Sequence, residues 1–210
     1  FKHGALPLTG DAREVLQALT AALFDYRVNA RYDRAVYELR REWDQEVQRL
    51  FHSDAEGKPA QSEVIGALYE FMRPKDVIVN AAGSAPGDLH KLWRSREHKS
   101  YHMEYGYSCM GYELPAALGI KLAAPEREVF ALVGDGTYLM QPSEITTSIQ
   151  EGLKINIILI ENHGFASIGS LSRSLGSEGF GTTYRVREEK TGQYTGDFLP
   201  LDFIASARGF

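Results

Sequence analysis

Residues 61–210 alternate between near-continuous apolar runs and amphipathic stretches. Three apolar runs have the length of a buried strand: 76–83 (DVIVNAAG), 127–136 (REVFALVGDG) and 154–164 (KINIILIENHG). The amphipathic stretches have a helical spacing of apolar residues: 62–72, 111–125 and 142–152. Strands that are apolar along their whole length are typical of parallel sheets with helices on both faces. The pattern therefore predicts an α/β fold, with a parallel sheet flanked by helices on both faces.

Local boundary signals accompany two of these helices. Ser62 is the predicted N-cap of the helix at 62–72, and the sequence Arg73-Pro74 is expected to end that helix. Pro142 is expected in the first turn of the helix at 142–152, where a missing backbone N–H is tolerated.

The first 60 residues have a different pattern. Residues 5–23 predict a short strand, a turn and a helix, with Asp11 as the N-cap and Glu14 three residues later. The stripe of this helix that we expect to be buried consists of Val15, Leu16, Leu19 and Leu23. Residues 26–50 predict one amphipathic helix with a charged, solvated face. Residues 52–61 (HSDAEGKPAQ) have the composition of a linker, so residues 26–60 are predicted to form a helical linker.

Composition narrows the possible partners. The hydrophobic fraction is 43%, which is ordinary for a globular protein, and the net charge is −5, which argues against nucleic acid as a partner. The single cysteine, Cys109, excludes an internal disulfide and fits a cytoplasmic protein. The apolar runs are far shorter than the roughly 20 residues that a bilayer requires, so no membrane association is expected. The chain lacks an initiator Met and begins and ends within elements, so we expect a piece of a longer protein.

Polar groups stand where the apolar runs end. Asp135 lies between Gly134 and Gly136 at the end of one run, and Asn162 follows the next run, 27 residues later. Ligands of open α/β sheets bind outside the carboxyl ends of the strands. A carboxylate beside a phosphate needs a cation between them, and Mg²⁺ binds one or two protein oxygens together with phosphate oxygens. We therefore predict that Asp135 and Asn162 hold Mg²⁺, which in turn holds a diphosphate; the alternative is a plain turn.

Other phosphate and catalytic motifs are absent. The sequence contains no G-x-x-x-x-G-K-[ST] loop, no G-x-G-x-x-G that opens a helix, and no G-x-S-x-G nucleophile motif. One cysteine and six scattered histidines provide no zinc-binding spacing.

The ordered pattern resembles the diphosphate-binding domain of thiamine diphosphate (ThDP) enzymes, the acetolactate synthase and pyruvate decarboxylase superfamily. Residues 104–125 and 133–165 resemble two consecutive segments of that domain, and the resemblance extends over about 61–210. It implies a domain order of 1–25 as the end of a central α/β domain, 26–60 as a linker and 61–210 as the cofactor-binding domain. It also implies two cofactors, ThDP and Mg²⁺.

The resemblance assigns roles to individual positions. The implied magnesium ligands are Asp135, Asn162 and the backbone carbonyl of Gly164. The residues implied to touch ThDP are Gly83, Ser84, Ala85, Ser108, Met110, Gly134, Gly136 and Thr137. Met110 is implied to wedge under the cofactor and bend it into a V, which makes deprotonation of the reactive carbon intramolecular. Ser108 is implied to offer its backbone carbonyl to the aminopyrimidine.

The implied active site is shared between subunits. In the family, a glutamate from the pyrimidine-binding domain of a partner subunit activates the cofactor, so a homodimer or homotetramer is expected. No glutamate of this chain is assigned that role, and the isolated chain is expected to be inactive. His163 is the candidate acid–base residue by type. Other candidates to face the substrate lie in a Gly- and Ser-rich segment that is expected to be mobile, with an ordinary surface loop as the alternative: Ser167, Ser170, Ser172 and Arg173.

Within the superfamily, residues 80–93, 101–113 and 163–185 are similar to the hydrolases that open a cyclic 1,2-dione in inositol catabolism. This similarity implies hydrolytic cleavage of a C–C bond in a small cyclic diketone, yielding 5-deoxyglucuronate. Two alternatives remain open: a carboligase or decarboxylase like acetolactate synthase, and a cofactor-binding module without catalysis.

Overall fold

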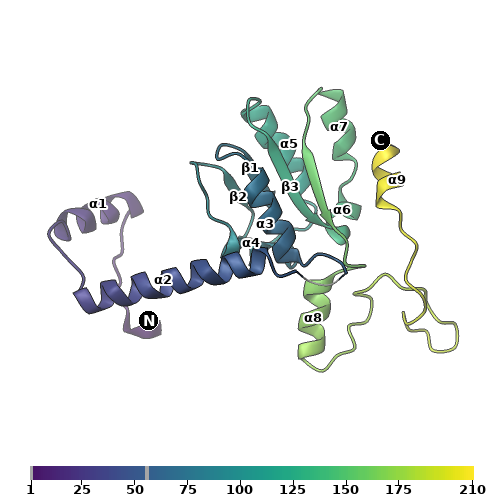
Figure 1. Ribbon diagram of the computed structural model, residues 1–210, viewed down its shortest axis with the longest axis horizontal. Helices are drawn as coiled ribbons and strands as arrows, with labels where there is room; N and C mark the ends of the chain where they lie inside the picture. The colour runs from purple at the N-terminus through teal and green to yellow at the C-terminus, as the bar shows by residue number, and fades with distance from the viewer. Residues whose placement is uncertain (1, 55–56) are drawn as a thin grey trace. The chain divides into compact units, whose positions relative to one another are not determined.

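The computed structural model describes residues 2–54 and 57–210, and its internal contacts divide the chain into two compact units (Figure 1). Unit 1 is Phe1–Glu46 and unit 2 is Val47–Phe210. Much of the predicted linker is one long helix, α2 (Ala30–Phe51). Residues 55–56, which belong to the predicted turn-rich part of the linker, lie outside the described residues.

Unit 2 is built on a four-stranded parallel sheet with the order β2-β1-β3-β4. The strands are β1 (Val77–Asn80), β2 (Tyr101–Met103), β3 (Val129–Gly134) and β4 (Asn156–Ile160). The three strands predicted from the apolar runs are β1, β3 and β4, and they are neighbours in the sheet. The chain runs from β1 to β2 on one side and then crosses to β3 and β4 on the other, so the direction of winding reverses between β1 and β3.

Alternate residues of the strands face two separate cores, as the continuous apolar runs predict. One core packs Ile78, Phe130 and Leu132 against helices α3 (Gln61–Phe71) and α4 (Ala85–Leu92). The other packs Val79 and Val133, with their neighbours, against helix α5 (Glu113–Ala123). Helices therefore cover both faces of the parallel sheet, and the predicted fold class is confirmed.

The remaining helices of the described residues are short. They are η1 (Lys2–Gly4), α1 (Ala12–Ala22), α6 (Asp135–Met140), α7 (Glu144–Gln150), α8 (Ala166–Ser174) and α9 (Phe203–Arg208). The sequence pattern did not predict β2, α4, α6 or α8. Each has at most nine residues, and three of them contain glycine or serine, which weakens the periodic signal.

Two predicted helix boundaries are wrong. Helix α3 begins at Gln61, because the Glu63 carboxylate reaches back and accepts the Ala60 N–H at 2.6 Å, so Ser62 lies inside the first turn. Helix α7 begins at Glu144, and the Pro142 carbonyl accepts the Ile145 N–H at 3.1 Å in a turn before it. Pro142 therefore precedes the helix.

In unit 1 the predicted N-cap is confirmed and the predicted buried stripe is wrong. The Asp11 carboxylate accepts the N–H groups of Arg13 and Glu14 at 3.0 and 3.2 Å. No residue of α1 is buried, and Leu16 is 63% exposed. The short strand expected before α1 does not form, since residues 5–9 are irregular.

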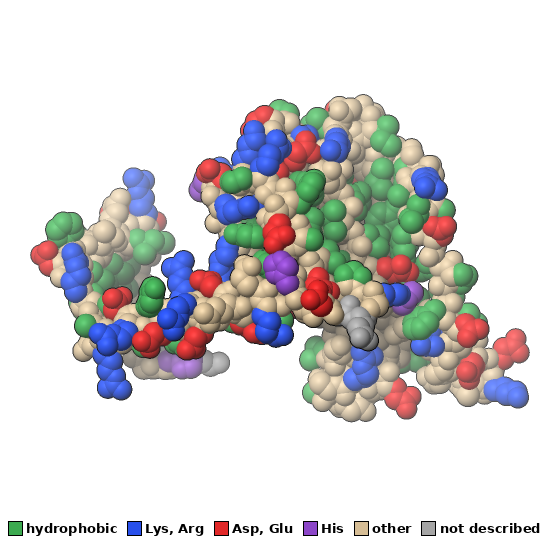
Figure 2. Space-filling model, viewed as in Figure 1, with side chains coloured by type: hydrophobic (Ala, Val, Ile, Leu, Met, Phe, Trp, Pro, Cys, Tyr) green, Lys and Arg blue, Asp and Glu red, His purple; other side chains and the backbone are tan. Residues whose placement is uncertain are grey.

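Strand β4 lies at one edge of the sheet and is less buried than the central strands. All five of its residues are partly exposed, whereas β1 is fully buried. Hydrophobic side chains gather on the face of unit 2 around β4 and α9 (Figure 2). Ile157 and Leu159 of β4 share a groove there with Phe203 and Ile204 of α9.

Within residues 2–54 and 57–210, no helix has both the length and the hydrophobicity that crossing a bilayer requires.

Gly119→Ala is expected to raise the free energy of unfolding by about 0.5–1 kcal/mol, because alanine is the better helix former. Gly119 lies exposed in α5, and a Cβ atom there would meet nothing within 4 Å. Urea denaturation measures the change. Gly66→Ala is the matched control in α3: its Cβ would lie 2.6 Å from the Phe51 ring, so this variant should be less stable. Equal effects of the two substitutions would contradict this account.

Candidate functional site

The carboxyl ends of β1, β3 and β4 open onto one pocket. The loop after β1 provides Gly83 and Ser84, the segment after β3 provides Gly136 and Thr137, and the turn after β4 provides Asn162. The pocket therefore lies where the winding of the sheet reverses, which is the usual place for a ligand in open α/β sheets. It has a volume of about 250 Å³.

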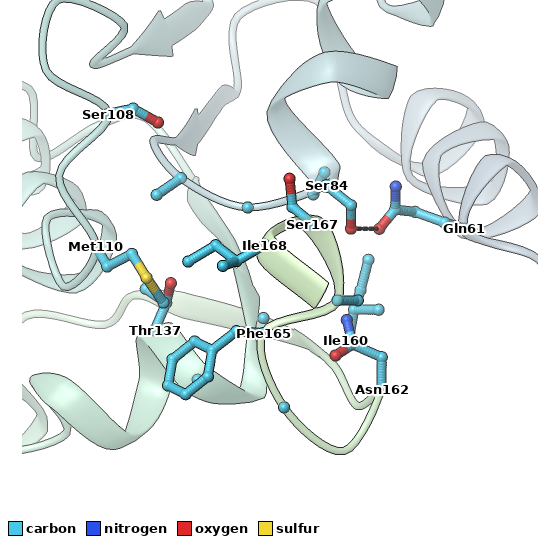
Figure 3. Close-up of a pocket in the computed structure, with 17 residues that line it drawn as sticks. Gln61, Ser84, Ser108, Met110, Thr137, Ile160, Asn162, Phe165, Ser167 and Ile168 are labelled. Atoms are coloured by element: carbon cyan, nitrogen blue, oxygen red, sulfur yellow. Dashed lines mark hydrogen bonds between the residues drawn. The ribbon is translucent and has the colours of Figure 1, made fainter. Parts of the chain in front are cut away.

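The pocket gathers all eight residues that the resemblance assigned to the cofactor. These are Gly83, Ser84, Ala85, Ser108, Met110, Gly134, Gly136 and Thr137. Asn162 and Gly164, two of the three predicted magnesium ligands, line the same pocket. The other side of the pocket is formed mainly by the start of α8, with Phe165, Ser167 and Ile168 (Figure 3).

Asp135, the third predicted ligand, connects two of the strand ends. Its carboxylate is fully buried. Oδ1 accepts the N–H of Gly136 at 2.8 Å, and Oδ2 accepts the N–H groups of Asn162 and Gly164, both at 3.1 Å. The two polar residues at the strand ends, 27 positions apart, are thus in direct contact through the backbone of one and the side chain of the other. These hydrogen bonds hold the turn after β4 against the start of α6.

The shape of this turn depends on unusual backbone angles. His163 has φ 60°, a left-handed conformation, and Gly164 has φ 145°. Gly164 is also paired with Thr183 in an antiparallel bridge, and a Cβ on Gly164 would lie 2.4 Å from the Thr182 carbonyl oxygen. Only glycine fits there. The turn is therefore specified both by its backbone and by the Asp135 carboxylate.

Gly136 is needed for a close approach rather than for its backbone angles. A Cβ on Gly136 would lie 2.7 Å from the Phe165 ring and 3.2 Å from the Tyr184 hydroxyl. The Phe165 and Tyr184 rings meet edge to face, with centroids 5.7 Å apart. Burial and the negative charge of Asp135 raise the pKa of Tyr184. Gly136 thus lets the residues that follow β4 pack directly on the start of α6, whereas a Cβ on Gly134 would meet nothing within 4 Å.

Helices α4 and α8 are two of the helices that begin at the pocket. Gly83 has φ 101° and leads into α4 through Ser84, and α8 begins at Ala166, which also lines the pocket. The first N–H groups of a helix have no partner within the helix and carry a partial positive charge. Such helix starts are suited to an anion such as a diphosphate.

The loop before α5 provides Ser108 and Met110. Glu104 holds this loop, since its carboxylate accepts the N–H groups of Tyr107 and Cys109 at 2.9 and 2.8 Å. These hydrogen bonds lower the pKa of Glu104. Ser108, between them, has the left-handed φ of 53°. The Met110 side chain points into the pocket (Figure 3), where it can contact a bound molecule.

Gln61 is a pocket residue that the sequence analysis missed. Its Oε1 accepts the Ser84 hydroxyl at 3.1 Å (Figure 3). Its Nε2 donates to Asp88 at 2.6 Å. Gln61 therefore joins the start of α3 to the start of α4. The partners are more than 20 residues away in the sequence, and no local pattern signals such a contact.

The structure places the candidate acid–base residue and most of the polar segment outside the pocket. The His163 ring lies against Phe198, with centroids 4.6 Å apart, and its Nδ1 is 3.5 Å from Glu161. His163 does not line the pocket. Of the four candidates in the following segment, only Ser167 lines it; Arg173 donates to Ser170 at 3.4 Å and borders a different cavity. Residues 166–174 of this segment form helix α8.

The donor atoms at this site fit a hard cation held together with a phosphate. A buried carboxylate, a side-chain amide and a glycine carbonyl are oxygen donors, which Mg²⁺ prefers, and phosphate oxygens and water complete such sites. Each carboxylate oxygen has two lone pairs. Oδ1 of Asp135 uses one for the Gly136 N–H and retains one for a cation. Within residues 2–54 and 57–210, no group of three or more His, Cys, Asp or Glu side chains offers a competing metal site.

Comparison with known proteins identifies the cofactor domain. Residues 81–210 match the family described as "Thiamine pyrophosphate enzyme, C-terminal TPP binding domain". The whole chain is 40% identical to proteins named 3D-(3,5/4)-trihydroxycyclohexane-1,2-dione hydrolase from Clostridium tetani and Bacillus cereus. A relative of the same name from Geobacillus thermodenitrificans is also 40% identical. In each case the chain spans 36% of the length of the relative.

A solved structure shares the fold. The thiamine diphosphate-dependent 4-hydroxybenzoylformate decarboxylase of Rhodococcus jostii RHA1 superposes with a TM-score of 0.59 at 20% sequence identity. The similarity covers 74% of this chain and 27% of the decarboxylase chain. The family match covers more than half of the chain and includes the loops after β1, β3 and β4. The chain therefore belongs to the thiamine pyrophosphate enzyme family, and residues 81–210 are its C-terminal cofactor-binding domain.

Proposed function

We propose that this chain provides the Mg²⁺ and diphosphate half of the active site of a ThDP-dependent hydrolase. The proposed reaction is hydrolytic cleavage of a C–C bond in a cyclic 1,2-dione, trihydroxycyclohexanedione, to give 5-deoxyglucuronate in inositol catabolism. The relatives that bear this name match the chain over its whole length at 40% identity. Because the chain spans 36% of their length, the complete activity belongs to the full-length protein.

One observation carries the cofactor half of the proposal. The loops after β1, β3 and β4, together with the loop before α5, meet in a single pocket that contains Asn162, Gly164 and the residues assigned to ThDP. A chance arrangement of turns would not bring four separated segments, each with the residues that the family uses, to one cavity. Asp135 does not itself line the pocket, but its buried carboxylate accepts the N–H groups of Gly136 and Gly164, which do.

The residues divide the work of binding. Asp135, Asn162 and the Gly164 carbonyl hold Mg²⁺, which neutralises charge on the diphosphate. The N–H of Thr137 and the loop that begins at Gly83 would hold the diphosphate itself, with Gly136 beside them, because the Gly136 N–H already donates to Asp135. The fold already fixes these N–H and carbonyl groups in place, so they can stabilise the charges of the reaction without rearranging.

The aromatic end of the cofactor is held by the loop before α5. Met110 and Ser108 line this part of the pocket; Met110 would support the cofactor from one side, and the Ser108 carbonyl would accept a hydrogen bond from its aminopyrimidine. When bound, ThDP supplies a nucleophilic carbon and an electron sink for cleavage of a bond next to a carbonyl. Phe165 and Ile168 add apolar surface to the same cavity.

The proposal includes a partner. The glutamate that activates the aminopyrimidine comes from the pyrimidine-binding domain of a partner subunit, so the active unit is at least a homodimer, or a homotetramer. His163 is not retained as the acid–base residue, since its ring lies against Phe198 and outside the pocket. Ser167 is the remaining candidate of the polar segment to face the substrate.

The experiment compares two substrates on the full-length protein with ThDP and Mg²⁺. We expect a larger kcat/KM for the cyclic dione, with release of an open-chain acid. A larger kcat/KM for pyruvate, with formation of acetolactate or acetaldehyde, would establish the carboligase or decarboxylase alternative. Binding of ThDP without turnover of either substrate would support the non-catalytic module. Omitting ThDP is the control, and it should abolish turnover.

A further inference from the structure

Glu113 is a buried acidic residue that the proposed function does not use. It is the first residue of α5, three positions after Met110, and its side chain is fully buried. Removing a carboxyl group from water is unfavourable unless polar partners compensate for the lost hydration. Burial accordingly raises the pKa of Glu113, while nearby backbone N–H groups oppose the rise. A carboxyl group kept in such a place needs a structural explanation.

One hydrogen bond joins the Glu113 carboxyl group to the loop that follows β1. Its Oε1 accepts the N–H of Ala82 at 3.1 Å. Its Oε2 is buried and makes no hydrogen bond within the described part of the chain. Glu113 thus lies between the loop that follows β1 and the loop that precedes α5.

Both loops form walls of the cofactor pocket. The loop after β1 provides Ala82 and Gly83, and the loop before α5 provides Ser108 and Met110. At these positions neither loop belongs to a helix or a strand. Gly83 and Gly111 have φ values of 101° and 89°, and glycine has more conformational freedom than other residues, so the backbone alone does not fix these loops. A weaker second link joins the loops, since the Ser108 hydroxyl donates to the Ala81 carbonyl at 3.4 Å.

Glu113 is not part of the pocket wall, and it contacts the backbone of a residue that is. It is absent from the lining of the pocket, and Ala82 is the pocket residue that it holds. The role of an acceptor also survives protonation. A protonated carboxyl group still accepts a hydrogen bond through its carbonyl oxygen, and its proton can reside on the other oxygen.

From this geometry we propose that Glu113 is a positioning residue of the cofactor pocket. By accepting the Ala82 N–H, it fixes the loop of residues 81–85 against the loop of residues 104–112, and this spacing sets the width of the cavity that receives the diphosphate cofactor. The inference rests on the proposed function, because it names a residue that shapes the same site.

The test measures ThDP affinity by isothermal titration calorimetry on the full-length protein at saturating Mg²⁺. Glu113→Gln keeps an acceptor oxygen at the same reach and should bind ThDP within about threefold of wild type. Glu113→Leu has no acceptor, and Glu113→Asp is one methylene too short to reach Ala82. Both should bind ThDP at least about tenfold more weakly. Glu151, an exposed residue after α7, is the matched control: Glu151→Gln and Glu151→Leu should bind like wild type.

The set separates positioning from packing. Wild-type affinity in Glu113→Leu would show that the side chain only fills space and would overturn the inference. A loss in Glu113→Gln as large as in Glu113→Leu would also overturn it, because the acceptor would not be the relevant group. Circular dichroism checks the fold of each variant, and if the leucine variant does not fold, Glu113→Asp decides. Failure of the wild type to bind ThDP would instead overturn the proposed function, and the inference with it.

Discussion

Asp135→Ala in the full-length protein should abolish Mg²⁺-dependent binding of thiamine diphosphate. Asp135 supplies the only carboxylate proposed to hold the cation. Without this carboxylate the cation is not held, and the negative charge of the diphosphate is then not neutralised. We expect the affinity for ThDP in the presence of Mg²⁺ to fall by more than about 100-fold, beyond the loss typical of residues that only support a metal ligand. Calorimetric titration of ThDP, with and without Mg²⁺, measures the effect.

A second substitution separates the two roles of this side chain. Asp135 accepts three backbone N–H groups, so alanine also releases the turn after β4. Asp135→Asn keeps the shape and an acceptor oxygen but removes the charge, and it too should lose the Mg²⁺ dependence. The control is Glu151→Gln, which removes an exposed carboxylate away from the pocket. Unchanged Mg²⁺-dependent affinity in Asp135→Asn would contradict the assignment of the metal ligand.

Gly164→Ala should lower the free energy of unfolding by about 2–4 kcal/mol and weaken ThDP binding. The new Cβ would lie 2.4 Å from the Thr182 carbonyl oxygen and 2.9 Å from the Thr183 Cα. These are backbone atoms, held by the bridge between Gly164 and Thr183, so they cannot move aside as a flexible side chain does. The φ of 145° adds strain for any residue with a side chain. Urea denaturation and calorimetry measure the two effects.

Gly152→Ala is the control for Gly164→Ala. Gly152 also has a positive φ, 63°, but a Cβ there would meet nothing within 4 Å. This variant should lose only about 1 kcal/mol, from backbone strain alone, and keep its affinity for ThDP. If the two variants were equally stable, the overlap with Thr182 would not be the cause.

The parts of the fold that were predictable are those with a strong periodic signal. Strands β1, β3 and β4 are near-continuous apolar runs, and the burial of alternate residues in two different cores explains why no polar alternation appears. Strand β2 has three residues, and its pairing with β1 is a tertiary contact, so the local pattern did not reveal it. The spacing of the apolar residues in α1 predicts a buried face. Spacing shows only that a face is apolar, however, and not that another element covers it.

The site was predictable where it depends on strand ends. The carboxyl ends of parallel neighbouring strands meet at one edge of a sheet, so the contact between Asp135 and the turn at Asn162 follows from order and direction alone. Gln61 and Glu113 depend instead on contacts across 23 and 31 residues. His163 was selected by its residue type, whereas its left-handed backbone and its contact with Phe198 decide where the ring lies.

The hydrogen bonds from Asn162 and Gly164 to Asp135 have a kinetic consequence. They belong entirely to the protein, so the turn at the end of β4 is already in one conformation before a ligand arrives. A preorganised loop loses little conformational entropy on association, and no slow ordering step has to precede the encounter. The observed rate of cofactor association should then rise in proportion to cofactor concentration, without the plateau that marks a rate-limiting isomerisation.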